Sequence, residues 1–245
     1  MEEYAEAAFA AGYEVFGFCD HAPHLFGDGY VSRTRMEARE LCGYCDDIRA
    51  LKEKYSGRMN IQAGLEMEYF PEFFGEDIKL YRRCGVEYLI LGQHSVGTES
   101  LPGRLDSFSE TESPDTLKKY VDQCIAGIST GAYSYIAHPD VIHFIGDADL
   151  YKQECDRLIL AAKTSGLPLE VNLLGLCGAR HYPNPLFWER ASALGASVVI
   201  GVDAHSPSRV YVRKEIEAGL RFVEKYKLEL VSKIDTEKLK RLAGE

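Results

Sequence analysis

The sequence predicts an α/β fold in which parallel strands form a barrel and helices cover its outside. Short apolar runs alternate with longer amphipathic stretches along the chain, and the runs are apolar on both faces. Buried parallel strands have this pattern. A glycine follows several amphipathic stretches, as in AFAAGYE, RRCGVEY and SALGAS, where a left-handed residue ends a helix. These repeated helix–glycine–strand units predict βα architecture in a single domain over residues 1–245.

Six strands are recognisable by their β-branched and aromatic residues, and helical patterns lie between them. The strands are expected at residues 14–19, 60–65, 88–91, 134–137, 168–173 and 197–202. The helices are expected at residues 2–11, 35–54, 76–84, 113–130, 150–164, 185–194 and 208–225. The C-terminal stretch 227–245 is expected to form a final helix.

Composition narrows the class of protein. A chain of 245 residues with 46% hydrophobic residues can bury one large core. The net charge of -10 and the lack of a basic run count against nucleic acid as a partner, because phosphate binding needs a basic face. No apolar run reaches the roughly 18 residues of a membrane helix, and the N-terminal residues MEEYAEAAFAAGYE are acidic. We therefore expect a cytoplasmic protein without a membrane partner.

The seven cysteines are spread along the chain. Several, including Cys19, Cys84 and Cys124, lie in apolar runs, so reduced and packed thiols are expected. One CxxC pair, Cys42 and Cys45, lies in a helical pattern and has no second pair. Because a zinc ribbon needs two such pairs, we expect this one to be structural.

Imidazole and carboxylate groups follow most of the predicted strands. In a βα barrel the carboxyl ends of the strands converge on one face, where active sites are built. Together these groups suit zinc, manganese or iron, and two ions can hold a phosphate and activate water. The candidate metal ligands are His21, Glu66, His94, His138, Asp203 and His205.

The strings GFCDHAP, GLEMEY, LGQHS, YIAHPD and GVDAH, with EVNLLG before YPNP, resemble the ordered motifs of histidinol-phosphatases of the PHP (polymerase and histidinol phosphatase) family. The resemblance covers essentially the whole chain. It implies a distorted, TIM-like (β/α)7 barrel with two or three divalent metal ions. It also implies metal-dependent hydrolysis of a small phosphate ester, with L-histidinol phosphate as the leading substrate.

The resemblance also implies roles for individual residues. Glu66 matches a carboxylate that bridges two metals, and His94 and His138 match ligands of the second metal. Asp203 matches a ligand of the first metal. The ligands of the third metal are matched by His21 and His205.

Other positions carry the expected substrate contacts and catalytic roles. Arg180 matches an arginine that grips the substrate phosphate, for which a planar guanidinium is suited. His181 and Asn172 are expected to contact substrate as well. The expected catalytic residues are Arg180, Asp203 and His205, with Asp203 or a nearby histidine protonating the leaving alkoxide.

One departure from the family pattern concerns the start of the chain. Family members open with a strand carrying a His-x-His pair, whereas the first histidine here is His21. Six of seven expected strands are therefore recognisable, which leaves two open sheet edges. A start codon assigned too late is the preferred explanation. The alternative is a short chain whose gap is covered by a rearranged segment or a partner subunit, and the open edges favour a homodimer.

Two other functions stay open on the sequence alone. The same site in related proteins serves protein-tyrosine phosphatases and nucleases, although the acidic composition counts against a nuclease. The stretches YIAHPD and VNLLG favour the histidinol-phosphatase branch. The missing first motif is compatible with a catalytically inactive domain that binds one metal or none.

Overall fold

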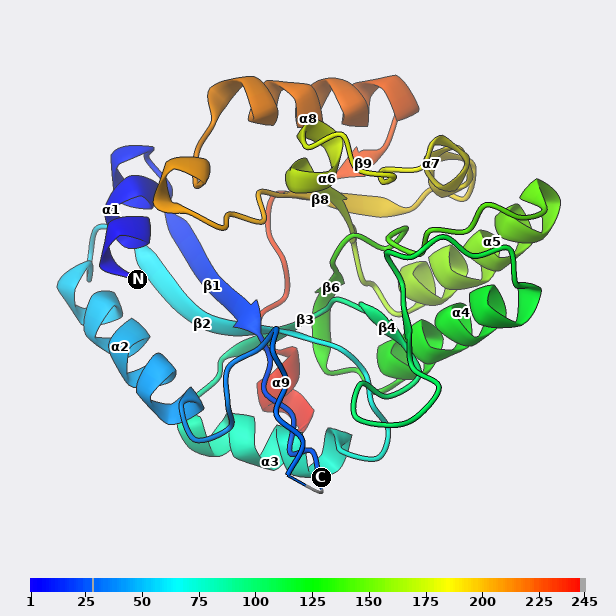
Figure 1. Cartoon of the computed structure of the whole chain (residues 1–245). Coiled ribbons are helices and arrows are strands. Elements are labelled where there is room, and N and C mark those ends of the chain that lie inside the picture. The colour runs from blue at the N-terminus through cyan, green and yellow to red at the C-terminus, as the bar shows by residue number, and fades with distance from the viewer. Residues whose placement is uncertain (28, 243–245) are drawn as a thin grey trace.

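The computed structural model describes residues 1–27 and 29–242 and has a curled, parallel sheet at its centre (Figure 1). The sheet has seven strands in the order β1-β2-β3-β6-β7-β8-β9, all paired in parallel, and forms a half-barrel. These strands are β1 (Val15–His21), β2 (Asn60–Met67), β3 (Tyr88–Leu91), β6 (Tyr133–Ile136), β7 (Leu169–Asn172), β8 (Ser197–Gly201) and β9 (Glu229–Leu230). A separate antiparallel hairpin consists of β4 (Ser95–Val96) and β5 (Leu105–Asp106).

Helices lie around the outside of the sheet (Figure 1). They are α1 (Glu2–Ala10), α2 (Leu41–Lys54), α3 (Phe74–Cys84), α4 (Pro114–Ser129), α5 (Ala148–Thr164), α6 (Leu173–Cys177), α7 (Pro185–Ala193), α8 (Arg213–Tyr226) and α9 (Lys238–Arg241), with a 3-10 turn at Pro207–Arg209. Local sequence fixes several helix starts. Ser113 and Asp147 each accept a backbone N–H of the first turn of the helix that follows, which satisfies a donor without a helical partner. The predicted α/β fold of TIM-like type, with parallel strands and outer helices, is therefore confirmed, and the sheet forms a half-barrel rather than a closed barrel.

Tyr88 lies on the inner face of the half-barrel and lines part of its cavity. Tyr88 lies against the backbone of Gly17 and Gly64, where a Cβ atom would come within 2.2 Å of the tyrosine side chain. Successive side chains of a strand point to opposite faces, so Glu66 shares the inner face with Gly64. The Tyr88 side chain therefore lies directly below Glu66, and the Glu66 carboxylate lies at the carboxyl end of the half-barrel.

The C-terminal stretch differs from the expected final helix. Lys227 has φ 52 and ends α8, and residues 229–230 then pair with β8 as β9. Only α9, over Lys238–Arg241, is helical within 227–242. The unpaired edge of β8 offers backbone donors and acceptors to this segment, and this tertiary pairing overrides the local helical pattern.

Helix boundaries were also wrong at two other places. The helix expected at 35–54 begins at Leu41, because residues before it form a loop whose Arg35 reaches the carboxylates of Glu68 and Glu99. The helix expected at 208–225 begins at Arg213, after a 3-10 turn.

The sheet remains open on one side. Within residues 1–27 and 29–242, β1 pairs only with β2, and β8 pairs with β9 only through its first two residues, Ser197 and Val198. A cavity of about 440 Å³ lies beside this opening, lined by residues such as Phe16, Val199 and Ile234. The open edges are as expected, and the homodimer and single domain stay predictions.

In the part of the chain that the structure describes, we find no helix with the length and apolar character needed to cross a membrane. The cytoplasmic location stays a prediction.

A disulfide joins the outer helices α2 and α3. Cys42 in the first turn of α2 is bonded to Cys84 at the end of α3, with 4.5 Å between their Cα atoms. The expectation of reduced thiols is wrong for this pair. The two cysteines are 42 residues apart in sequence, and only the packing of α2 against α3 brings them together. Cys45 is a free, buried thiol, so the CxxC pair is not bonded within itself.

We predict that Cys42→Ala lowers the free energy of unfolding by about 2–4 kcal/mol, because the bond removes conformations from the unfolded chain. The measurement is urea unfolding with and without a reductant. Reductant should destabilise the wild type by a similar amount and leave Cys42→Ala unchanged. Equal stability of all four samples would contradict the disulfide.

Candidate metal centre and active site

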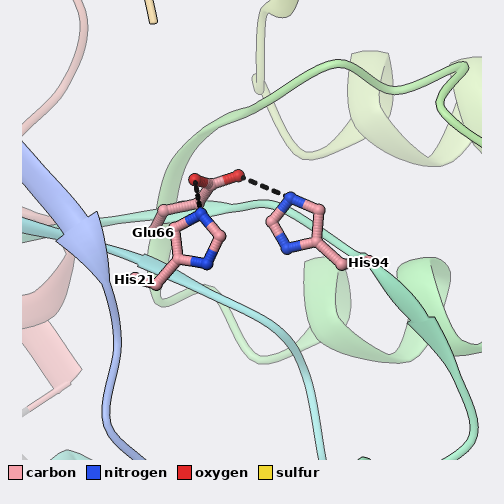
Figure 2. Close-up of side chains that lie close together, drawn as sticks. All are labelled: His21, Glu66 and His94. Atoms are coloured by element: carbon pink, nitrogen blue, oxygen red, sulfur yellow. Dashed lines mark ion pairs between the residues drawn. The ribbon is translucent and has the colours of Figure 1, made fainter. Parts of the chain in front are cut away.

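Three side chains from neighbouring strands meet at the carboxyl end of the half-barrel (Figure 2). His21 is the last residue of β1, and the parallel register places it beside Glu66 of β2. His94 follows β3, the next strand in the sheet. Adjacent strands lie about 4.8 Å apart, so side chains on the same face of these strand ends converge.

Glu66 is the centre of the cluster. Its Oε2 lies 3.5 Å from His21 Nε2, and its Oε1 lies 3.3 Å from His94 Nε2. His138, which follows β6, places its Nε2 2.8 Å from the same Oε1. The Nε2 atoms of His94 and His138 are 3.2 Å apart. One carboxylate thus faces three imidazoles.

Charge is concentrated at this point. Burial by itself raises the pKa of Glu66, but His94 and His138 lower it well below its usual range. Burial likewise lowers the pKa of His138, but the hydrogen bond and charge of Glu66, with Glu170 and Asp203, raise it to about 9. Several carboxylates therefore act on one buried imidazole, and the site favours a positive charge in the form of a proton or a metal cation.

The donor set fits a metal ion. Ligand atoms of His21, Glu66 and His94 all lie within 4.8 Å of one another. Two imidazole nitrogens and a carboxylate oxygen are ligands that zinc takes in catalytic sites. His138 contacts the same carboxylate oxygen and can serve as a further ligand.

Asp203 and His205 lie at the end of β8. Asp203, with φ 47, accepts a hydrogen bond from Asn172 Nδ2 at 3.1 Å, and its charge acts on His138. The side chain of His205 is 68% exposed, with Nδ1 3.4 Å from Asp203 Oδ1. The structure thus brings Asp203 near the cluster, whereas His205 points its Nδ1 toward Asp203 and lies mostly in solvent.

Arg180 lies beside the cluster, separated from it by two aromatic rings. Its guanidinium carbon is 5.9 Å from the ring centre of Phe108 and 5.8 Å from that of Tyr182, and Nη1 donates to Tyr182 Oη at 3.0 Å. The Phe108 ring stacks on His94, and the Tyr182 ring lies 5.9 Å from that of His138. The Phe108 and Tyr182 rings therefore connect the Arg180 guanidinium to the imidazoles of His94 and His138 through a continuous series of contacts.

The other two expected substrate contacts have different surroundings. His181 Nε2 donates to the carbonyl of Val141 at 2.6 Å, and its ring stacks on His143. Asn172 is 2% exposed, and its amide groups bond to Gly175, Glu170 and Asp203. The amide of Asn172 therefore makes its hydrogen bonds inside the protein, and the expected contacts of Asn172 and His181 with substrate stay predictions.

Sequence reasoning missed two buried carboxylates near the site. Asp140 accepts hydrogen bonds from the backbone N–H of Asn184 and from Trp188 Nε1, which ties down the segment after Tyr182. Burial raises the pKa of Asp140 to about 6 and that of Glu170 to about 7. A charged residue inside the apolar run PLEVNLL was the available signal for Glu170.

The fold and this cluster define a class of α/β half-barrels with a histidine–carboxylate site at the carboxyl ends of their strands. The chain belongs to the PHP domain family, whose pattern matches residues 1–173. This confirms the resemblance found in the sequence.

Known relatives agree with this assignment. The chain is 27% identical to the probable histidinol-phosphatase of Deinococcus radiodurans over 231 residues, which cover 92% of this chain and 84% of that protein. It is 34% identical to the histidinol-phosphatase of Bacillus subtilis over 106 residues, covering 41% and 39% of the two chains. In fold it is similar to the histidinol phosphate phosphatase of Lactococcus lactis, crystallised with zinc, L-histidinol and phosphate. That similarity has a TM-score of 0.70 at 17% identity and covers 97% of this chain and 91% of the other.

We predict that Gly92→Ala weakens zinc binding, because its Cβ would lie 1.9 Å from Glu66 Oε1 and the carboxylate would have to move. A loss of about 10-fold or more is expected. Affinity is measured by competition with a chromophoric chelator. The control is Gly75→Ala in α3, where a Cβ meets nothing within 4 Å. Unchanged affinity in a folded Gly92→Ala protein would remove Glu66 from the metal site.

Proposed function

We propose that this protein is a metal-dependent histidinol-phosphatase, which hydrolyses L-histidinol phosphate to L-histidinol and phosphate. The observation that carries the proposal is the convergence of His94, His138 and Glu66 beside an arginine. A cation site next to a guanidinium suits a dianionic phosphate ester. The names of the two relatives and the ligands of the Lactococcus lactis enzyme support the same substrate.

The residues that would hold the metal are those expected from the sequence, namely His21, Glu66, His94, His138, Asp203 and His205. His21, His94 and His138 contact the Glu66 carboxylate, and Asp203 lies near His138. Zinc is the first choice because the Lactococcus lactis structure contains it, and manganese or iron also suits these donors. When bound, such ions neutralise phosphate charge and lower the pKa of water.

Other residues of the chain are proposed to bind the phosphate and to protonate the leaving group. Arg180 grips the non-bridging oxygens of the phosphate, with Phe108 and Tyr182 holding the guanidinium in place. Asp203 is the proposed proton donor to the leaving alkoxide. His205 is kept as the second candidate, since its Nδ1 lies 3.4 Å from Asp203 Oδ1.

The direct test is phosphate release by the purified chain with zinc or manganese. L-Histidinol phosphate should be cleaved with a higher kcat/KM than phosphotyrosine peptides or a nucleic-acid substrate. Preferred cleavage of either competitor would favour another phosphoesterase of the family. Metal binding without release of phosphate from any ester would favour an inactive binding domain.

Removing the arginine tests the phosphate contact. We predict that Arg180→Met lowers kcat/KM for L-histidinol phosphate about 10- to 100-fold, the effect of losing a hydrogen bond to a charged group. Zinc affinity should not change. The control is Arg213→Met, at an arginine of α8 that is 81% exposed and pairs with Glu217. An Arg180→Met enzyme as active as the control would exclude this role.

A further inference from the structure

The backbone N–H groups of two site histidines each donate to a buried carboxylate from a neighbouring strand. His94 N donates to Glu68 Oε1 at 2.9 Å, and His138 N donates to Glu170 Oε2 at 2.9 Å. Glu68 directly follows β2, and Glu170 lies in β7, so the two carboxylates flank the central pair β3–β6. They are 1% and 3% exposed.

Both N–H groups lie beyond the ends of their strands. Because β3 ends at Leu91 and β6 at Ile136, regular sheet pairing does not hold the backbone at His94 and His138. A neutral acceptor could satisfy each N–H group, whereas a buried carboxylate is costly unless it is well paired. Glu68 and Glu170 therefore each accept a hydrogen bond that the sheet does not supply, at the point where a site histidine follows its strand.

Each carboxylate is itself held from a second side. Asn172 Nδ2 donates to Glu170 Oε2 at 3.0 Å and to Asp203 Oδ2 at 3.1 Å, so one amide links Glu170 to a candidate metal ligand. Glu68 forms an ion pair with Arg35, whose Nε donates to Glu99 at 2.8 Å. The Arg35 side chain is only 3% exposed. Each carboxylate is therefore held by a second hydrogen bond or ion pair.

The bond to Glu170 holds an unusual backbone. His138 has φ 29, close to the left-handed region that non-glycine residues rarely adopt. This conformation sets the direction in which the imidazole leaves the chain. From it, His138 Nε2 reaches within 2.8 Å of Glu66 and 3.2 Å of His94 Nε2.

We propose that Glu68 and Glu170 are positioning residues that hold the backbone of His94 and His138 so that both imidazoles converge on Glu66. In this proposal both carboxylates act through the two histidines and are neither metal ligands nor substrate contacts. The inference rests on the proposed metal site and deepens it. It predicts that metal affinity depends on a hydrogen-bond acceptor at position 170, rather than on the charge there.

The experiment compares Glu170→Ala with Glu170→Gln by zinc competition with a chelator and by the visible spectrum of the cobalt-loaded protein. Loss of the acceptor in Glu170→Ala should weaken zinc binding about 10- to 100-fold and change the cobalt spectrum. Glu170→Gln keeps an oxygen for the His138 N–H group, and its affinity and spectrum should stay close to those of the wild type.

The matched control is Glu154→Ala. Glu154 is as buried as Glu170, at 3% exposed, but it pairs with Arg157 on the outer helix α5. Its loss should lower stability without changing zinc affinity. If Glu170→Ala does not fold, Gly201→Ala replaces it, because a Cβ there would lie 1.7 Å from Glu170 Oε1 and displace the carboxylate.

Two results would overturn the inference. One is wild-type zinc affinity and cobalt spectrum in folded Glu170→Ala or Gly201→Ala. The other is an equal loss in Glu170→Gln and Glu170→Ala, which would assign the effect to charge. A wild-type protein that binds no zinc would instead reject the metal site, and the inference with it, so the two failures are distinguishable.

Discussion

The contact of one buried carboxylate, Glu66, with three imidazoles is the interaction on which the rest of the site depends. Glu66 is 9% exposed, and burying a carboxylate is unfavourable unless positive charge or hydrogen bonds compensate it. His21 ends β1, whereas His94 and His138 follow β3 and β6, so the compensation exists only when these strands are assembled in the sheet. The fold therefore creates the site, and a cation at the site in turn stabilises the fold by mass action.

Space around this carboxylate is provided by residues without side chains. A Cβ atom at Gly92 would lie 1.9 Å from Glu66 Oε1. A Cβ atom at Gly201 would lie 1.7 Å from Glu170 Oε1, so both positions need glycine for the carboxylates to stay where they are. Tyr88 fits below Glu66 because Gly17 and Gly64 leave room for its ring. The carboxyl end of the half-barrel thus carries the charged groups of the site.

Much of this could be predicted from the sequence, because the signals are local. From the apolar runs, both ends of β3 were predicted correctly, and the ends of five other strands were predicted to within two residues. The polar residues at the ends of these runs identified His21, Glu66 and His138 as candidate site residues. What could not be predicted depends on tertiary contacts. The pairing of residues 229–230 with β8, the disulfide between Cys42 and Cys84, and the anchor at Glu170 each join parts of the chain that are distant in sequence.

The most direct measurement of the central claim is anomalous diffraction at the zinc edge from crystals of the zinc-loaded protein. The account predicts a peak about 2.0–2.2 Å from a Glu66 oxygen and from an imidazole nitrogen of His94 or His138. A peak bound only at another place, such as the exposed His205 or a free cysteine, would contradict it.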